Sequence, residues 1–156
     1  MSPSFHGLPV RSLGNEHLRL DYLVEAGPRI VHLSFAATGD NLLVECPDLT
    51  IPTPLGAFHL YGGHRLWHAP EAMPRSYVPD DSPIEVVDAP SGVCLVQPVE
   101  QLTGIRKSIE LALVPDKPSV IVTHTLKNQG QWAVELACWA LSQMRLGGLV
   151  VLPQPA

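Results

Sequence analysis

The chain has 156 residues, of which 46% are hydrophobic and 16% are charged. This length and composition exclude a disordered chain and predict one globular domain, residues 1–156, with a full hydrophobic core. Lys and Arg total 10 against 15 for Asp and Glu, and the net charge of -5 opposes nonspecific attraction to nucleic acid or to an anionic membrane.

The amino terminus and the cysteines bear on the cellular compartment. Residues 1–7 show no positive flank followed by an apolar run, and no apolar stretch reaches membrane-spanning length. Cys46, Cys94 and Cys138 lie far apart inside apolar segments, which is typical of small buried side chains in a reducing compartment. We therefore expect a cytoplasmic protein with no nucleic-acid or membrane partner.

Alternation of apolar residues predicts the first strands of the chain. Residues 18–24 and 29–35 alternate with the period of half-buried strands, and a turn at residues 26–28 joins them. Residues 38–41 have the composition of another turn and lead into an apolar run at residues 42–46. Three antiparallel strands in a meander follow from this order.

The middle of the chain, residues 47–83, has no sustained period, because prolines and the glycine pair Gly62 and Gly63 interrupt it. We therefore predict a long irregular excursion between the strands. Loops of this length inside a compact domain are usually functional or mobile.

Regular alternation returns in the second half of the chain. Residues 84–88 and 93–97 have the pattern of a hairpin, and two further strands are predicted at residues 105–113 and 120–127. Residues 132–144 are mostly apolar, and their length and alanines also fit a buried helix, but we favour a strand that is buried on both faces.

A short apolar run at residues 149–152 precedes the final prolines. The whole chain then contains about eight or nine strands with a turn about every ten residues, which is typical of a sandwich or barrel. Because no linker divides the sequence, we predict a single all-β domain built as an antiparallel β-sandwich.

The most unusual segment is residues 61–71, which read YGGHRLWHAPE. Arg65 and Trp67 are suited to gripping a polar, flat ligand, and the glycine pair allows a sharp turn or a close approach of another surface. In a carbohydrate site Trp67 would stack on a sugar ring while polar side chains hydrogen-bond its hydroxyls or a carboxylate. The predicted substrate-binding residues are His64, Arg65, Trp67, His68 and Glu71.

Two other interpretations of this segment remain open. In one, Trp67 belongs to the core and Arg65 pairs with a nearby carboxylate, which is Glu71, Asp80 or Asp81. In the other, three imidazoles and a carboxylate bind a transition metal, although their spacing matches no recognised metal signature. The candidate metal ligands are His59, His64, His68 and Glu71. We predict neither a metal nor another cofactor.

Catalysis has weaker support in the sequence. It contains no Gly-x-Ser-x-Gly elbow and no phosphate-binding glycine loop, and burial in an apolar strand makes a cysteine a poor nucleophile. General acid–base work is open to histidines in principle, and the candidates are His32, His64, His68 and His124. His32 and His124 lie in apolar strands, which favours a structural role for both. No residue can be assigned as catalytic.

Several stretches resemble a known family. Residues 18–35, with Gly27-Pro28-Arg29 at the turn, resemble the opening hairpin of galactose mutarotase-like (aldose 1-epimerase-like) proteins. Residues 123–130, THTLKNQG, resemble the polar turn that precedes the central sheet of that superfamily. The motif YGGHRLW and the PDDSP sequence of residues 79–83 resemble an uncharacterised branch of it.

The resemblance implies an antiparallel sandwich of the galactose mutarotase-like, or supersandwich, type, with a sugar site on a concave sheet face. Family enzymes open and close hexose rings with a histidine acid, a glutamate base and an arginine that holds the sugar, and Arg65 is the counterpart of that arginine. Residues 135–143, which should carry the acid, contain no histidine. Complete members are about twice as long, so the chain resembles their N-terminal half and the base belongs to the other half.

The expected function is therefore binding of a carbohydrate or sugar acid, with epimerase or mutarotase activity when the domain is complete. The alternatives are a noncatalytic binding or assembly β-module and a histidine-based metal-dependent enzyme. An incomplete sandwich leaves open sheet edges, which predicts a homo-oligomer formed through them.

Overall fold

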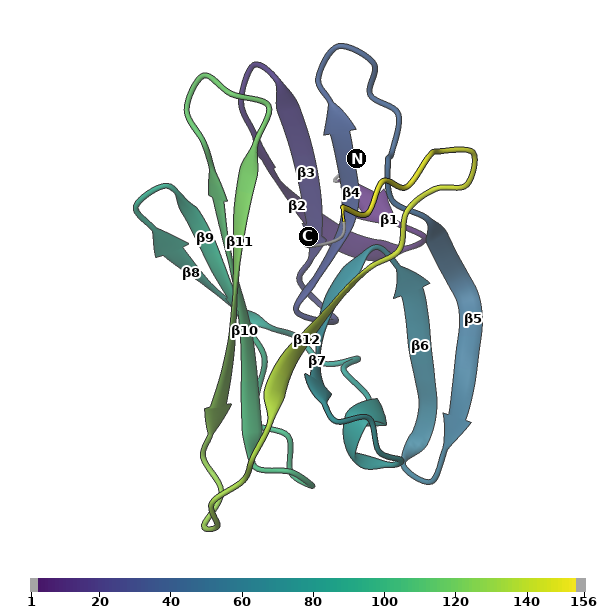
Figure 1. Ribbon diagram of the computed structural model, residues 1–156, viewed down its shortest axis with the longest axis vertical. Helices are drawn as coiled ribbons and strands as arrows, with labels where there is room; N and C mark the ends of the chain where they lie inside the picture. Colours follow the sequence, from purple (N-terminus) through teal and green to yellow (C-terminus); the bar gives the residue numbers. More distant parts are fainter. Residues whose placement is uncertain (1–2, 154–156) are drawn as a thin grey trace.

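Two facing antiparallel sheets and a separate hairpin make up the fold (Figure 1). The structure is a computed structural model, and it describes residues 3–153. The strands of the described chain are β1 (Ser4–Phe5), β2 (Leu8–Gly14), β3 (Leu18–Leu23), β4 (Arg29–Phe35), β5 (Glu45–Thr53), β6 (Gly56–Gly62), β7 (His64–Ala69), β8 (Glu85–Ala89), β9 (Gly92–Val96), β10 (Ile105–Leu113), β11 (Val120–Asn128) and β12 (Ala137–Ser142).

The larger sheet has six strands in the order β1-β2-β3-β4-β7-β12, and the smaller has four in the order β11-β10-β9-β8. Within the described chain, β5 and β6 pair only with each other and form the hairpin beside the larger sheet (Figure 1). The prediction of an all-β sandwich of antiparallel sheets is confirmed. The galactose mutarotase-like type of that sandwich stays a prediction.

The core lies between the two sheets, where apolar side chains at alternate positions of facing strands meet. Its buried members are Leu20, Tyr22, Ile30, Leu43, Leu66, Val93, Leu95, Ile109 and Leu111. Alternation located these strands well, because β4 and β10 have the predicted bounds and β3 and β11 differ from them by one residue. The predicted hairpin at residues 84–97 corresponds to β8 and β9.

The prediction that residues 47–83 are irregular was wrong, because they contain most of β5 and all of β6 and β7. Pro47 and Pro52 lie within β5, which has a partner on one side only among the described residues. A proline is tolerated on such an edge because no neighbouring strand needs its missing N–H. Prolines therefore concealed the strand without preventing it. The helical element of this stretch is the short 3-10 turn η1 (Arg75–Tyr77).

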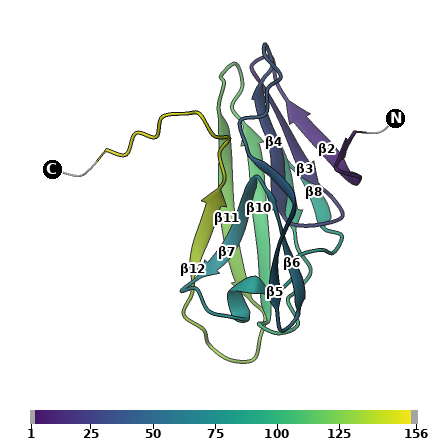
Figure 2. The ribbon, with the colours of Figure 1, turned by 90° about the vertical axis from the view of Figure 1, so that its right-hand side faces the viewer.

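Two further expectations were also wrong. The neighbour of β4 is β7 rather than the apolar run at residues 42–46, in which Leu43 makes only an isolated bridge to Met144. Within residues 132–144, β12 is exposed or half-buried and not buried on both faces. Residues 149–152 form no strand, and the chain leaves the sheets on the β12 side (Figure 2).

The three cysteines differ in exposure. Cys46 and Cys94 are half-buried, while Cys138 is exposed, so the expected burial is wrong for Cys138. All three are free thiols. No helix within residues 3–153 has the length and apolar character needed to cross a membrane.

The glycine pair Gly62 and Gly63 lies where β6 turns into β7 and crosses other backbone at close range. Gly63 has φ +76°, and a Cβ atom added to it would lie 2.0 Å from the carbonyl oxygen of Ile30. Its N–H donates to the carbonyl of Val44 (3.0 Å), and its carbonyl accepts from the N–H of Gln143 (2.8 Å). The pair therefore fixes where β7 enters the larger sheet between β4 and β12.

Replacement of Gly63 by alanine tests this crossing. We expect Gly63→Ala to lower the free energy of unfolding by about 3 kcal/mol or more, because the backbone of Ile30 must move. Gly39 is a matched control, since it has φ +73° but a Cβ atom added to it would meet no other atom within 4 Å, and Gly39→Ala should cost about 1 kcal/mol. Urea denaturation measures both, and equal losses would contradict the steric explanation.

Candidate functional site

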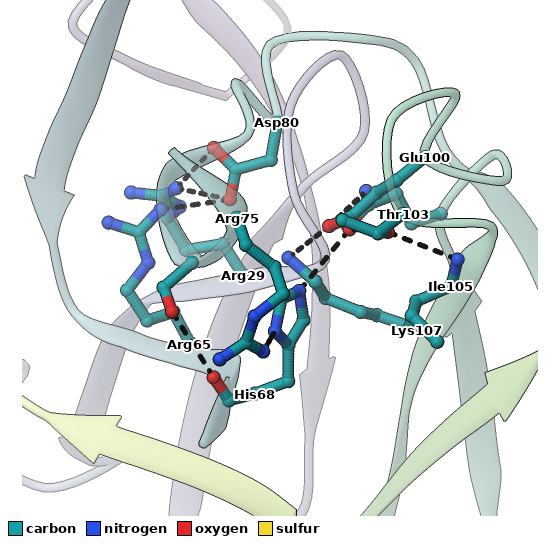
Figure 3. Close-up of polar contacts among 11 residues, drawn as sticks. Arg29, Arg65, His68, Arg75, Asp80, Glu100, Thr103, Ile105 and Lys107 are labelled. Atoms are coloured by element: carbon teal, nitrogen blue, oxygen red, sulfur yellow. Dashed lines mark hydrogen bonds and ion pairs between the residues drawn. The ribbon is translucent and has the colours of Figure 1, made fainter. Parts of the chain in front are cut away.

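Asp80 forms a buried ion-pair group with two arginines (Figure 3). Arg29 begins β4 and donates from Nη2 to both carboxylate oxygens, at 2.9 and 2.8 Å, while Arg65 of β7 donates from Nη2 to Oδ2 at 2.9 Å. All three residues are at most 5% exposed. Burial by itself raises the pKa of Asp80, but the charges of Arg29 and Arg65 outweigh it and hold the pKa well below its usual range.

Arg65 also lies against aromatic rings. Its Cζ atom is 4.3 Å from the ring centroid of Phe58 and 5.0 Å from that of Trp67, within the range of cation–π contacts. Its Nε and Nη1 are buried and have no hydrogen-bond partner among the described residues. Burial lowers the pKa of Arg65 to about 10, against the opposing effect of Asp80, so the guanidinium remains charged at neutral pH.

A second buried group surrounds Glu100, beside the first (Figure 3). Its carboxylate accepts from Lys107 Nζ (2.5 Å), Thr103 Oγ1 (2.5 Å) and His68 Nε2 (3.3 Å). Burial raises the pKa of Glu100, but these contacts overcome it and lower the pKa to about 2. Arg75 Nη1 lies 2.7 Å from His68 Nδ1. Because a guanidinium only donates, Nδ1 is the acceptor of this contact and Nε2 donates to Glu100.

A cleft of about 380 Å³ opens beside these two groups. It lies between residues 78–82 and 97–102, and both Asp80 and Glu100 border it. Gln97 borders it too and is 6% exposed. The Nε2 of Gln97 faces Glu100 Oε1 at 3.4 Å, while its buried Oε1 has no hydrogen-bond partner within residues 3–153.

The structure divides the predicted binding residues between the two faces of β7. Arg65 and Trp67 point toward the β5–β6 hairpin, where they contact Phe58. His64 and His68 point toward the smaller sheet, where they contact His124 and Glu100, respectively. Glu71 is exposed and accepts from the hydroxyl of Tyr77. The contacts of Trp67 and Arg65 agree with the interpretation of a core tryptophan and an Asp80-paired arginine, and ligand binding by the five residues stays a prediction.

The four residues considered as metal ligands have separate partners. His59 pairs with Asp81 at 2.7 Å, His64 and His68 have the partners given above, and Glu71 contacts Tyr77. Among residues 3–153, no group of three or more His, Cys, Asp or Glu side chains is placed to hold a metal ion. The structure therefore gives no support to the metal interpretation.

Sequence reasoning missed Arg29, Gln97, Glu100 and Lys107. The alternation of strand residues could have identified two of them. Lys107 lies on the same face of its strand as the buried Ile105 and Ile109. Arg29 lies on the same face of its strand as the buried Val31. A charged residue at an inward position of a strand must be paired when the sheet is buried. Gln97 and Glu100 lie just after β9, where no such periodicity applies.

His64 and His124 join the two sheets on the side of β11 and β12. Their Nε2 atoms lie 2.8 Å apart, and His64 Nδ1 lies 2.7 Å from Ser142 Oγ. Burial and, to a lesser extent, His124 lower the pKa of His64 to about 4. Burial also lowers the pKa of His124. His124 is thus half-buried and hydrogen-bonded across the sandwich rather than fully enclosed in the core.

Comparison of the chain with models of protein families, with curated proteins and with solved structures found no match. The resemblance to galactose mutarotase-like proteins accordingly stays a prediction. The geometry itself offers a cleft lined by Asp80, Glu100 and Gln97, and the buried Oε1 of Gln97 lacks a hydrogen-bond donor among residues 3–153.

Replacement of Arg65 by alanine should destabilise the fold strongly. The change removes one of two cations from a buried carboxylate, and such losses cost about 3–5 kcal/mol. The side chain of Arg19 is 53% exposed and pairs with Asp21, which keeps the hydroxyl of Ser12 as a donor (2.6 Å) when the arginine is removed, so the control Arg19→Ala should cost about 1 kcal/mol or less. Chemical denaturation of both variants measures the difference. A small loss for Arg65→Ala would show that Asp80 does not depend on it.

The His64–His124 contact predicts a loss of stability in acid. An unfolded histidine has a pKa of about 6.5, so between that value and about 4 the unfolded chain binds a proton that folded His64 does not. The contribution of His64 to the free energy of unfolding is therefore fully present above pH 6.5. It declines by about 1–2 kcal/mol as the pH falls toward 4, given the partial solvent exposure of the side chain. Denaturation at several pH values should show a smaller decline for His64→Gln than for the wild type.

Proposed function

We propose that the protein binds a carbohydrate or sugar acid in the cleft between residues 78–82 and 97–102. The observation that carries the proposal is the Oε1 atom of Gln97, which is buried beside the cleft without a hydrogen-bond partner in the described chain. The Nε2 atom of the same amide faces Glu100, and this orientation leaves Oε1 as an acceptor. A ligand hydroxyl would supply the missing donor.

The size and lining of the cleft support a small, partly polar ligand. A volume of about 380 Å³ lies within the range of small-molecule sites, which combine apolar walls with a few polar groups. The apolar lining residues are Leu55, Val78, Pro79, Pro98, Val99 and Leu102. They give a ring its apolar contacts, while Gln97, Ser82 and the two carboxylates provide acceptors for hydroxyl groups.

Arg65 acts in this proposal as a positioning residue. It holds Asp80, and Asp80 in turn borders the cleft, so the arginine shapes the site through the carboxylate. Mutarotation would also require an acid and a base that exchange protons with the sugar. The pair formed by His68 and Glu100 (3.3 Å) is the histidine–carboxylate pair nearest to the cleft and is our candidate for that exchange.

Ligand-induced stabilisation tests the proposal. A bound monosaccharide at ten times its Kd should add about 1.4 kcal/mol to the free energy of unfolding, which corresponds to a rise in Tm of about 3–5 °C. We expect such a rise for members of a panel of hexoses, polyols and sugar acids. Polarimetry of glucose and galactose mutarotation tests catalysis separately.

The variant for this test is Gln97→Met, since Arg65→Ala destabilises the fold and would weaken binding indirectly. Methionine keeps the volume and removes the unpaired acceptor, so the free variant should be as stable as the wild type. Its Tm should no longer respond to the sugar. Gln129→Met, at an exposed glutamine away from the cleft, should keep the response. A panel in which no compound raises the Tm would refute carbohydrate binding.

A further inference from the structure

Both sheets end on the same flank of the molecule, at β11 and β12. Each of these strands has a hydrogen-bonded neighbour on one side only within residues 3–153. The two edges are close together, since Cys138 Sγ lies 3.8 Å from the carbonyl oxygen of His124. Inward-facing residues of β11, such as Val122 and Leu126, are only half-buried. The sandwich is therefore open along this flank.

The edge at β12 lacks the charges and prolines that protect the edges at β8 and β5. Natural edge strands carry charges or prolines that prevent pairing with another chain. β8 carries Glu85 and Asp88, and β5 carries Asp48 with its two prolines. β12 reads ACWALS and contains neither a charge nor a proline. Its unpaired backbone groups are thus free to accept another strand.

Large apolar side chains are exposed in the segments that precede and follow β12. Trp132 is 80% exposed and Leu146 is 93% exposed, and the apolar residues 149–152 leave the sheets on the β12 side (Figure 2). Exposed apolar side chains on both flanking segments indicate an interaction site in a protein that is otherwise well packed.

The charges beside β12 indicate what the partner is. Residues 129–152 contain two charged side chains, Glu135 and Arg145, and both are exposed. They lie at equal distances from Ala140, five residues before it and five after it. In an antiparallel pair of two β12 strands centred on Ala140, Glu135 of each copy would face Arg145 of the other. Two-fold pairing of identical strands requires this kind of self-complementarity.

We propose that β12 pairs antiparallel with β12 of a second copy of this chain, with a two-fold axis at Ala140. In this register Trp139 faces Leu141 of the second copy, and Cys138 faces Ser142. The two residues of each opposed pair have numbers that are both odd or both even, and such residues lie on the same face of β12. Each opposed pair therefore points to the same face of the joined sheet. The two larger sheets then form one continuous sheet.

Elsewhere the surface disfavours self-association. The chain carries a net charge of -5, so two copies repel each other through most orientations. Residues 129–152, which contain β12, hold one charge of each sign and are neutral overall. Identical copies can therefore approach each other closely on this surface. Such a dimer would fit the noncatalytic assembly module, which is the alternative function expected from the sequence.

Charge exchange tests both the dimer and its register. Light scattering and sedimentation at about 100 µM should show a dimer for the wild-type chain. Glu135→Arg and Arg145→Glu should each weaken it by about tenfold or more, because each creates two like-charge contacts per dimer. The double variant should restore wild-type affinity. Glu25→Arg, a control at an exposed glutamate away from β12, should leave the dimer unchanged.

A cross-link provides a second, independent measurement. Residues at the centre of an antiparallel pair have Cα atoms about 4.5–5.5 Å apart, which suits a disulfide. Ala140→Cys, made together with Cys138→Ser, should therefore give a covalent dimer on mild oxidation. A monomeric wild type at the stated concentration would overturn the proposal. The proposal would also be overturned if Glu135→Arg and Arg145→Glu left the dimer affinity unchanged and the Ala140→Cys variant formed no cross-link.

Discussion

The ion pairs of Asp80 with Arg29 and Arg65 hold together three parts of the chain that are distant in sequence. Arg29 begins β4, Arg65 lies in β7, and Asp80 belongs to the segment between η1 and β8. A buried carboxylate without a cation is far more costly than a lost surface contact, so the segment must lie where both arginines reach it. The N–H of Gly27 also donates to the carbonyl of Asp80 at 2.7 Å. This anchoring gives the cleft one of its walls.

The second carboxylate, Glu100, joins the two sheets in the same way. Lys107 reaches it from β10 of the smaller sheet, and His68 reaches it from β7 of the larger sheet. Apolar residues at these positions would stabilise the fold equally well or better. Buried ion pairs seldom contribute more to the free energy of unfolding than well-packed hydrophobic residues of similar volume. Two such groups side by side, with ionised carboxylates at one cleft, make this cleft the place at which we propose a binding site.

Alternation in the sequence was enough to locate the strands whose two faces differ, such as β4 and β10. The same pattern gave wrong predictions for strands whose residues do not alternate between apolar and polar. β5 contains prolines that an edge position tolerates, and β12 is half-exposed although its composition is apolar. The site was harder still, because its residues come from separate strands and loops. Lys107 was recognisable by its inward parity, whereas the partner of each charge depends on the sheet order, which periodicity does not specify.

The composition of residues 61–71 has mostly architectural causes. Gly62 and Gly63 permit a backbone crossing, and Arg65 neutralises Asp80. Because successive side chains of β7 alternate between faces, its histidines lie on one face of the strand and its Arg65–Trp67 pair lies on the other. The Oε1 of Gln97, like the Nε and Nη1 of Arg65, has no hydrogen-bond partner within residues 3–153. The segment singled out for its composition therefore owes much of that composition to a backbone crossing and a buried ion pair, and its role in ligand binding stays a prediction.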